Sequence, residues 1–555
     1  MPLVTLTTVP GISVRLHPAT LARSLSMPAL LLVGCTPERA VPSCATCATV
    51  QVAAVREPPF VLPPLVQETV GRDIGDRVFE RLATLTPGAA TIDATGFRPA
   101  LAERWERVDS LTWRFALRRG ARWHDGHPLT ADDVVFSFEA YTDTTLAAMA
   151  APALEGVRAV AVDSATVEVR FPRPGAEQLY DATAHVRVLP RHVWDRVPRG
   201  EWMADTSLAR LVGSGPYRVQ SWLRGQSLTL DADTTRRPLP EVRRVVWRFT
   251  ADPEAALNLV LAHEADLLET VLGDEAAARV AADTSYRLVR YPAAVFGFLG
   301  FRVAGEKGAH PVLGDRAVRQ ALTLATDRAS LARALVGEGA TVPPGPMSRL
   351  LWIAGEGEGS PPYDTTAAAA QLEQAGWKRE GARRVKAGRP LALDILVPST
   401  STVRKRYAEA LQAAWRLLGV EATVTAVDFP VFQQRLAEGR FDSYIGAYLD
   451  EPSPRGIVEQ WTTRGIGALN HGHWSNPAFD AGVDSALAAP DLATARRYWR
   501  AALDTLAVDA PAIFLYTPEQ RAAVQRRIGG VDINPYSWLE GVEKWTVDVR
   551  AGDRR

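Results

Sequence analysis

The stretch from Arg122 to Glu139, "RWHDGHPLTADDVVFSFE", constrains the local fold more than any other part of the chain. Just before it, "LTWRFALR" alternates apolar and polar side chains with the period of two of a half-buried strand. Asp125-Gly126 supplies the positive φ of a tight turn, and Pro128 fixes the exit from that turn. The next apolar residues recur at helical spacing: Val134, Val135, Phe138 and Tyr141. We therefore predict a strand, a turn and a helix that begins near Ala131.

Architecture accounts for most polar residues of this stretch. Thr130 stands three residues before Asp133, close to the pattern of a capping box. Asp132 and Asp133 fall in the first helical turn, where a carboxylate gains about 0.3–1 kcal/mol from the helix dipole. His124 and His127 would need a convergent third ligand to hold a metal ion, and the local sequence offers none that architecture does not explain. We therefore predict that this stretch is structural, with no metal site and no catalytic residue.

The length of the chain and its charge narrow the class of protein. A chain of 555 residues is too long for one hydrophobic core, so two or three domains are expected. Lys plus Arg and Asp plus Glu both total 63, a balance that argues against a nucleic-acid-binding protein. The sequence contains neither a G-x-S-x-G nor an H-E-x-x-H motif, and no cysteine follows Cys47. We expect a protein that is not an enzyme and that carries no cofactor.

Residues 1–35 have the order of a secretory signal. The apolar stretch "LSMPALLLVGC" follows three basic residues, Arg15, His17 and Arg23, and ends in small residues. Its last four residues, "LVGC", resemble a lipobox, in which Cys35 would receive the lipid. The apolar run is shorter than the roughly 20 residues that span a bilayer. The alternative is a buried N-terminal helix with a core cysteine.

Residues 36–60 are rich in Pro, Ala and Thr and are predicted to form a flexible tether. Cys44 and Cys47 within it form a C-x-x-C that would suit a redox pair or half of a zinc site. Neither a second C-x-x-C nor a βαβ pattern accompanies the motif. An incidental disulfide in the tether is therefore favoured.

The rest of the chain alternates strand and helix signals without a fixed repeat. Residues 212–233 read "VGSGPYRVQSWLRGQSLTLDAD", a Gly-rich turn that enters a hairpin. Its Gly-x-Gly leads into a strand, which argues against a dinucleotide-binding loop. Asp315 and Asp327 each stand at the predicted start of a helix. A long helix ends at Gly419 and is followed by the alternating strand Val420–Val427. This order suits one unit of an open α/β lobe.

Taken together, these segments resemble a known family. "LAERWE…TWRFALRRGARWHDGHPLTADDVVFSFE", residues 101–139, is followed in order by "GSGPYRV", "DRAVRQALTLATDR" and "NHGHWSNPAFDAGVDSA". The pattern is similar to the family 5 solute-binding proteins of bacterial ABC importers, which include oligopeptide-, dipeptide- and nickel-binding proteins. The resemblance covers roughly residues 80–549. His263 departs from it, because the family usually has Gly there.

The resemblance implies an α/β fold, the type II clamp of periplasmic binding proteins, with two lobes and an extra inserted domain. A ligand would lie between the lobes and be enclosed by hinge closure. The implied division is a discontinuous domain I (61–79, 208–290 and 516–555), an inserted domain II (80–207) and domain III (291–515).

The resemblance also implies where a peptide would bind. A desolvated N-terminal ammonium needs a carboxylate partner, because an unpaired buried charge is costly. In the family that carboxylate lies in the loop that matches "YLDEPSPRG", residues 448–456, so Asp450 and Glu451 are the candidates. Trp461 and Trp474 are the candidate pocket aromatics. The alternatives are an acid exposed on a loop and tryptophans that belong to the core.

The function implied by the resemblance is that of a binding lipoprotein at the periplasm or cell surface. It would act as a monomer and deliver oligopeptides or dipeptides to an ABC permease in the inner membrane. The alternative is the same fold binding a nickel-type metal chelate, a sugar or another small solute. "NHGHW" favours the metal alternative, since His471 and His473 would point the same way on a strand.

Overall fold

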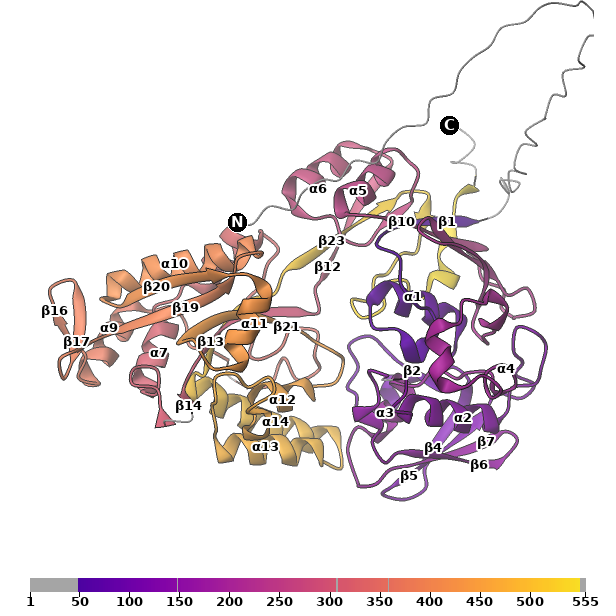
Figure 1. The fold of residues 1–555 in the computed structure, drawn as a ribbon, viewed down its shortest axis with the longest axis horizontal. Coiled ribbons are helices and arrows are strands. Elements are labelled where there is room, and N and C mark those ends of the chain that lie inside the picture. The colour runs from indigo at the N-terminus through magenta and orange to yellow at the C-terminus, as the bar shows by residue number, and fades with distance from the viewer. Residues whose placement is uncertain (1–47, 147, 306–307, 358, 550–555) are drawn as a thin grey trace, which may run out of the picture. The chain divides into compact units, whose positions relative to one another are not determined.

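The computed structural model describes residues 48–146, 148–305, 308–357 and 359–549, which belong to one compact unit (Figure 1). Cys35, Cys44 and Cys47 lie outside the described residues. Within the described residues, no helix is both long and apolar enough to cross a membrane.

A seven-stranded sheet is assembled from segments that lie far apart in the sequence. Its central strand β1 pairs in parallel with β10 and β11, whereas the other pairs are antiparallel. The helices α5 (Pro253–Leu261) and α6 (Gly273–Ala282) lie beside it (Figure 1). The strand order is β12 (Tyr286–Pro292), β23 (Glu519–Gln525), β11 (Leu267–Leu268), β1 (Thr49–Val55), β10 (Arg244–Thr250), β9 (Ser227–Ala232) and β8 (Tyr217–Leu223).

A four-stranded antiparallel sheet packs its apolar face against the helix α2 (Ala131–Thr142). Three further helices complete this region: α1 (Thr69–Val78), α3 (Gln178–Ala184) and α4 (Arg191–Trp194). We call the seven-stranded and four-stranded sheets with their helices the first lobe. The order of the smaller sheet is β4 (Ala102–Arg107), β5 (Thr112–Leu117), β7 (Thr166–Arg170) and β6 (Arg158–Asp163).

A five-stranded mixed sheet with its helices forms what we call the second lobe. Alternate residues of its strand β19 enter two different cores: Ile395 lies in the core with α10 (Thr402–Leu418), whereas Leu396 lies in the core with α11 (Phe429–Ala437) and α14 (Leu492–Asp509). Because both faces are covered, β19 is almost continuously apolar. The strand order is β20 (Glu421–Val427), β19 (Ala392–Pro398), β21 (Ser443–Leu449), β13 (Val295–Phe301) and β22 (Ala512–Tyr516).

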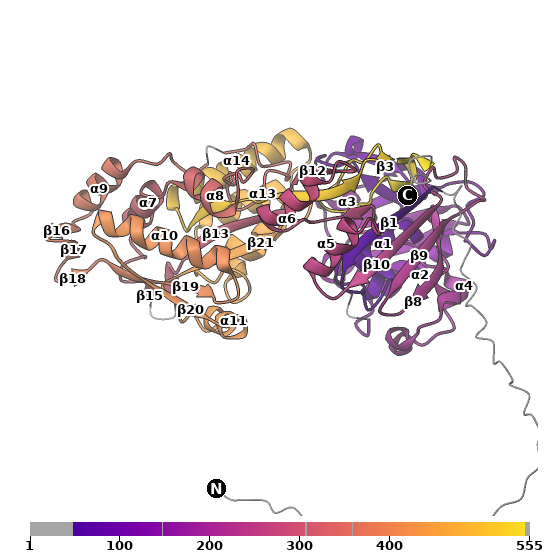
Figure 2. The same cartoon turned by 90° about the horizontal axis from the view of Figure 1, so that it is seen from above.

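The long helix α10 runs beside this sheet (Figure 2). The helices of the second lobe are α7 (Arg316–Leu324), α8 (Arg328–Val336), α9 (Thr365–Gln374), α10 (Thr402–Leu418), α11 (Phe429–Ala437), α12 (Gly456–Trp461), α13 (Pro477–Leu487) and α14 (Leu492–Asp509). Four small sheets carry the other strands: β2 (Ala83–Leu85) with β3 (Phe97–Pro99), β14 (Ala304–Gly305) with β15 (Gly308–Ala309), β16 (Lys378–Glu380) with β17 (Arg383–Lys386) and β18 (Arg389–Pro390), and β24 (Ile528–Gly529) with β25 (Thr546–Val547).

The flexible tether predicted for residues 36–60 is wrong from Thr49 onward, because Thr49–Val55 forms the strand β1. The following local predictions from the sequence are confirmed. The helix α2 begins at Ala131, and the Asp133 carboxylate accepts a hydrogen bond from the Thr130 backbone N–H (2.8 Å). The Asp315 and Asp327 side chains cap α7 and α8, respectively, because each accepts a hydrogen bond from a backbone N–H in the first turn of its helix. Gly419 ends α10 with φ of 88°. These signals are local in sequence, which explains why they could be recognised.

His124 joins two segments that are separate in sequence. Its Nε2–H donates to the Gly215 carbonyl (3.0 Å), and its Nδ1 accepts from the Gly213 backbone N–H (3.1 Å). Only 9% of His124 is exposed, and burial lowers its pKa to about 4. A Cβ on Gly213 would lie 1.9 Å from the Val78 carbonyl oxygen, so this glycine lets the end of α1 approach the turn. The predicted structural role of His124 is consistent with these contacts.

We expect His124→Ala to lower the free energy of unfolding at pH 7 by about 1–3 kcal/mol, because the Gly213 N–H and the Gly215 carbonyl lose their partner. The folded protein disfavours the charged imidazole, so between about pH 4 and 6.5 the unfolded chain binds more protons and wild-type stability falls with acid. The cost of the substitution should therefore shrink by roughly 1–2 kcal/mol between pH 7 and pH 5. Urea unfolding at both values measures it.

His127→Ala on the same turn is the matched control, because its side chain is 61% exposed. It should change the free energy of unfolding little at either pH. An equal cost for the two substitutions, or a cost for His124→Ala that does not depend on pH, would contradict a buried neutral His124.

Candidate functional site

The acidic loop, residues 448–456, begins at the end of β21 in the second lobe and carries the two candidate carboxylates. Asp450 accepts a hydrogen bond from the Ser348 backbone N–H and donates its own N–H to the Ala294 carbonyl (2.9 Å). Burial raises the pKa of Asp450 to about 6, against the opposing effect of Ser348. Across the described ranges, no Lys, Arg or His forms an ion pair with Asp450. It is therefore a partly buried acid without a cation.

Glu451 is exposed, but its charge reaches two tyrosines of the first lobe. Burial raises the pKa of Tyr180, on α3, and the charge of Glu451 raises it further. Burial also raises the pKa of Tyr536, and the charges of Asp450 and Glu451 add to that effect. The Tyr536 hydroxyl oxygen is buried and has no hydrogen-bond partner among the described residues. The acidic loop thus faces the first lobe.

The same loop carries an ion-pair network to α3. The Arg455 guanidinium pairs with Glu177 (2.8 Å) and donates to Asp181 (2.6 Å), and the Ser453 hydroxyl donates to Glu177 (2.7 Å). Glu177 is only 1% exposed. Burial raises its pKa although the charge of Arg455 opposes that shift. Ser453, Arg455 and the two acids therefore tie the second lobe to the first.

Further contacts surround this network. The other carboxylate oxygen of Glu177 accepts from the Thr91 hydroxyl, which in turn accepts from the Trp352 indole N–H (3.2 Å). The Ala176 backbone N–H donates to the Leu487 carbonyl (3.0 Å). The sequence predictions missed Glu177, Asp181 and Arg455. Of these, only Arg455 had a signal in the sequence, because it lies in the loop that was already singled out.

The first lobe adds two acids that the sequence predictions also missed. Asp73, on α1, is 1% exposed; one oxygen accepts from the Ser537 hydroxyl (3.2 Å), and the other has no partner among the described residues. Burial and the charge of Glu269 raise the pKa of Asp73. Burial alone raises the pKa of Glu269 to about 7. Because Ser537 directly follows Tyr536, Asp73 lies beside the segment that the acidic loop faces.

Trp461 and Trp474 are both packed in the core of the second lobe. The Trp461 ring centroid lies 5.3 Å from that of Phe298, and the indole N–H donates to Gln460 (3.3 Å). The Trp474 indole N–H donates to the Asp509 carboxylate (3.1 Å). The exposed fractions of the two residues are 5% and 3%. A ligand-binding role for either stays a prediction.

His471 and His473 lie in a turn, so the prediction that they share a strand face is wrong. His473 has φ of 52°, and Gly472 packs so tightly that a Cβ would lie 2.4 Å from the Phe301 carbonyl oxygen. Burial, followed by the charge of His473, lowers the pKa of His471. In the part of the chain that the structure describes, no third metal-ligating side chain converges on this pair.

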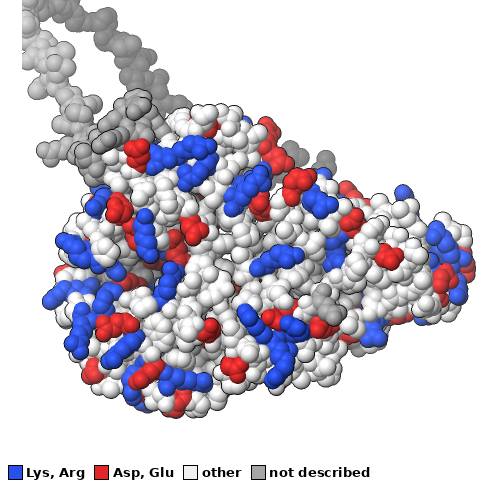
Figure 3. Space-filling view, turned by 180° about the vertical axis from the view of Figure 1, so that it is seen from behind, with Lys and Arg blue, Asp and Glu red and all other residues white. Residues whose placement is uncertain are grey.

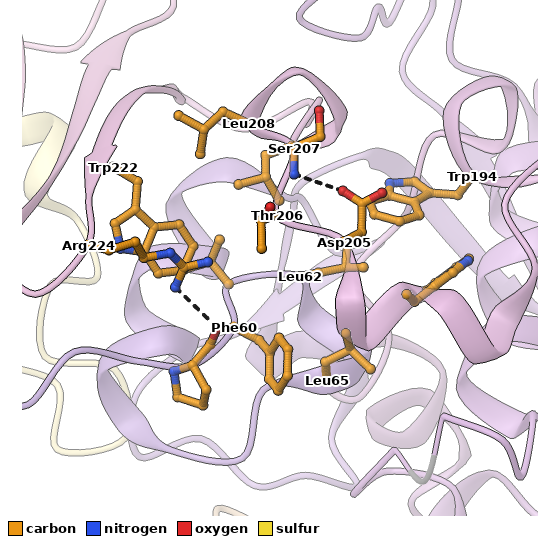
Figure 4. A pocket seen from close by; sticks show the side chains of 14 residues that line it. Phe60, Leu62, Leu65, Trp194, Asp205, Thr206, Ser207, Leu208, Trp222 and Arg224 are labelled. Carbon is orange, nitrogen blue, oxygen red and sulfur yellow. Dashed lines mark hydrogen bonds between the residues drawn. The ribbon is translucent and has the colours of Figure 1, made fainter.

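A separate pocket lies in the first lobe, beside β8 (Figure 4). Phe60, Leu62 and Leu65 line one part of it, and the Arg224 guanidinium stacks 3.5 Å above the Trp222 ring. None of the candidate site residues lines this pocket. On the face drawn in Figure 3, acidic and basic side chains are interspersed.

Comparison with known proteins gives consistent matches over most of the chain. The family model described as bacterial extracellular solute-binding proteins, family 5 Middle, matches residues 96–467. The oligopeptide-binding protein AppA of Bacillus subtilis is 24% identical over 460 residues, which cover 80% of this chain and 83% of AppA. Protein XP55 of Streptomyces lividans is 27% identical over 472 residues, which cover 84% of this chain and 82% of XP55.

Solved structures share the fold. AppA of Bacillus subtilis, solved with a nonapeptide, has a TM-score of 0.67 at 22% identity over 90% of this chain and 98% of AppA. CtaP of Listeria monocytogenes has a TM-score of 0.76 at 20% identity over 90% and 99% of the two chains. NikZ of Campylobacter jejuni, solved with Ni(L-His), has a TM-score of 0.69 at 22% identity over 90% and 99%. Together they show a two-lobed type II clamp.

We expect Arg455→Ala to lower the free energy of unfolding by about 1–3 kcal/mol. The substitution leaves Glu177 buried without its cation, and the cost stays below the 3–5 kcal/mol of a fully buried pair because Arg455 is 37% exposed. Adding Glu177→Gln to Arg455→Ala should recover part of the loss, because the uncompensated charge is removed. Urea unfolding of the single and double variants measures the coupling.

Arg464→Ala is the matched control in the same lobe. Arg464 pairs with Asp484, and the two side chains are 61% and 55% exposed, so this substitution should cost far less. If Arg455→Ala and Arg464→Ala lowered the free energy of unfolding equally, and the double variant recovered nothing, the ion-pair network around Arg455 would not stabilise the fold.

Proposed function

Because the chain belongs to the bacterial extracellular solute-binding proteins of family 5, we propose that it captures peptides between its lobes and delivers them to an ABC importer. Proteins of this family bind solutes for ABC importers and are not enzymes. The ligand, the delivery step and the anchoring of this chain are the proposed parts.

The observation that carries the peptide proposal is Asp450. An ionised carboxylate that is shielded from water is costly without a cation, and burial raises the pKa of Asp450 to about 6. A ligand ammonium would supply the missing charge. Asp450 is favoured over Glu451 because Glu451 is exposed, and an exposed pair adds only about 0–1 kcal/mol.

Two further buried acids support a ligand with a positively charged end. In the described part of the chain Asp73 and Glu269 form no ion pair, and burial raises the pKa of each, although the charge of Arg77 partly opposes that shift at Asp73. Extended peptides can be held through their backbone amides, which all peptides share. AppA of Bacillus subtilis, which shares the fold, was solved with a nonapeptide. Mass spectrometry of co-purified ligand tests the class directly: a mixture of short peptides supports the proposal.

The second candidate function is the binding of a metal chelate. NikZ of Campylobacter jejuni, solved with Ni(L-His), shares the fold. The His471–His473 pair offers two imidazoles to such a ligand but, among the described residues, no third group. One metal complex or another single small solute in the mass spectrum would favour this candidate.

We further propose that the protein is exported to the periplasm or cell surface and anchored through a lipid on Cys35, where it acts as a monomer. "LVGC" at residues 32–35 supports the lipid anchor. Each acyl chain adds about 0.8 kcal/mol per buried CH₂, so several chains on one cysteine suffice for stable attachment.

For a peptide with a free N-terminus, we expect Asp450→Asn to weaken binding ten- to a hundred-fold, about 1.4–2.8 kcal/mol. Only the ionised carboxylate binds the ammonium, so wild-type affinity should fall about tenfold between pH 7 and pH 5, as Asp450 takes up a proton with a pKa of about 6. Titration calorimetry at both pH values measures this. Asp450→Asn should lack the pH dependence.

The same peptide with an acetylated N-terminus separates the ammonium from the rest of the ligand. Acetylation should weaken binding to the wild type strongly and to Asp450→Asn only slightly. Glu451→Gln is the matched control and should behave like the wild type. If both variants bind the free peptide as the wild type does, Asp450 does not bind the ammonium.

We expect Cys35→Ser to release the protein from membranes into the soluble fraction, because the lipid would have no attachment site. Fractionation of cells that express the wild type or the variant, followed by immunoblotting, measures the distribution. Cys44→Ser is the matched control and should remain in the membrane fraction. Retention of Cys35→Ser in membranes would contradict lipidation at this residue.

A further inference from the structure

Asp125, His127 and His192 bring one carboxylate and two imidazoles together on the surface of the first lobe. His192 Nε2 lies 2.7 Å from Asp125 Oδ2, and His127 Nδ1 lies 3.2 Å from Asp125 Oδ1. One potential ligand atom from each residue lies within 4.8 Å of the other two. Within the described ranges, this is the one group of three or more His, Cys, Asp or Glu side chains that converges so closely.

Backbone hydrogen bonds fix the first two residues on the tight turn before α2. The Gly126 N–H donates to the Trp123 carbonyl, and the Trp123 N–H donates to the His127 carbonyl, both at 2.9 Å. The His127 N–H donates to the Asp125 carboxylate (3.1 Å). Gly126 has φ of 90°, which the turn requires. The carboxylate of Asp125 and the ring of His127 therefore leave the turn side by side.

The third residue comes from α4, which is anchored to the start of α2. The Arg191 N–H donates to the Asp133 carboxylate (2.9 Å), the same group that caps α2. The ring of His192 lies 4.3 Å from that of His127, stacked at 28°, and 6.3 Å from that of Trp123. Because both segments are tied to α2, the three side chains are positioned before any ligand arrives.

We propose that Asp125, His127 and His192 form a Zn²⁺ site that is separate from the acidic loop. Imidazole nitrogens and a carboxylate oxygen are common zinc ligands, with bonds of about 2.0–2.2 Å. Ligand atoms around one tetrahedral zinc ion therefore lie roughly 3.3 Å apart. The contacts at 2.7 and 3.2 Å, which reach different oxygens of Asp125, would open by roughly 0.6 and 0.1 Å to reach that separation. Water would fill the fourth position.

The charges around the site suit a divalent cation. Asp125 supplies a carboxylate, and among the described residues no Lys or Arg forms an ion pair with it. The nearby Arg191 guanidinium is oriented toward Asp132 and Asp195, at 3.9 and 3.7 Å. Mg²⁺ and Ca²⁺ prefer sets of oxygen ligands, so a site with two imidazoles disfavours both.

Titration calorimetry with ZnCl₂ tests the site on the full chain. All three cysteines are first replaced by Ser, because Cys44 and Cys47 would bind zinc themselves. The parent, stripped with EDTA and dialysed, should take up one Zn²⁺ per chain and no Mg²⁺. His127→Asn and His192→Asn should each weaken Zn²⁺ binding by at least about tenfold, since even changes outside the ligand shell cost 10–100-fold.

His263→Asn is the matched control, because His263 pairs with Asp283 (3.2 Å) outside any three-residue group of the described residues. It should bind Zn²⁺ like the parent, and circular dichroism should show that all variants fold. Absence of stoichiometric uptake by the parent, or unchanged affinity in His192→Asn, overturns the proposal. The site does not depend on the peptide proposal, since Zn²⁺ uptake is measured without peptide.

Discussion

The cost of shielding a carboxylate from water governs the region where the lobes meet. Glu177 is almost fully buried and has Arg455 as its cation, together with hydroxyl donors from Thr91 and Ser453. Among the described residues, the Asp450 carboxylate has only Ser348 as a hydrogen-bond partner, and burial raises its pKa to about 6. Burial of an acid is tolerated where a cation accompanies it. The chain supplies that cation at Glu177, and a ligand would have to supply it at Asp450.

Asp450 and the cation that pairs with Glu177 belong to one short segment, the acidic loop. Asp450 and Arg455 lie on the same loop of the second lobe, while Tyr536 and Glu177 are their neighbours on the first. Any hinge motion that moves the second lobe as a body would shift both ends of the loop together. A ligand that pairs with Asp450 and the network around Arg455 would therefore favour the same relative position of the lobes.

Local structure could be predicted because it depends on neighbouring residues. The helix start at Ala131, the caps at Asp315 and Asp327 and the end of α10 at Gly419 each follow from a few adjacent side chains. His263 shows the limit of such prediction, since it stands where the resembling family has Gly. It keeps a left-handed φ of 59°, a conformation in which His is more common than most residues.

Sites built from distant segments could not be predicted in the same way. Arg455 and Asp181 are 274 positions apart, and His192 lies 67 positions after Asp125. No periodicity encodes such pairs, because tertiary packing alone decides which surfaces meet. A lone histidine on a short helix, such as His192 on α4, carries no sequence signal. The sequence around His124–His127 therefore gave no third metal ligand, whereas the fold brings α4 beside that turn. The two histidines of that turn have different surroundings: His124 is buried and forms hydrogen bonds with Gly213 and Gly215, whereas His127 lies on the surface beside Asp125 and His192.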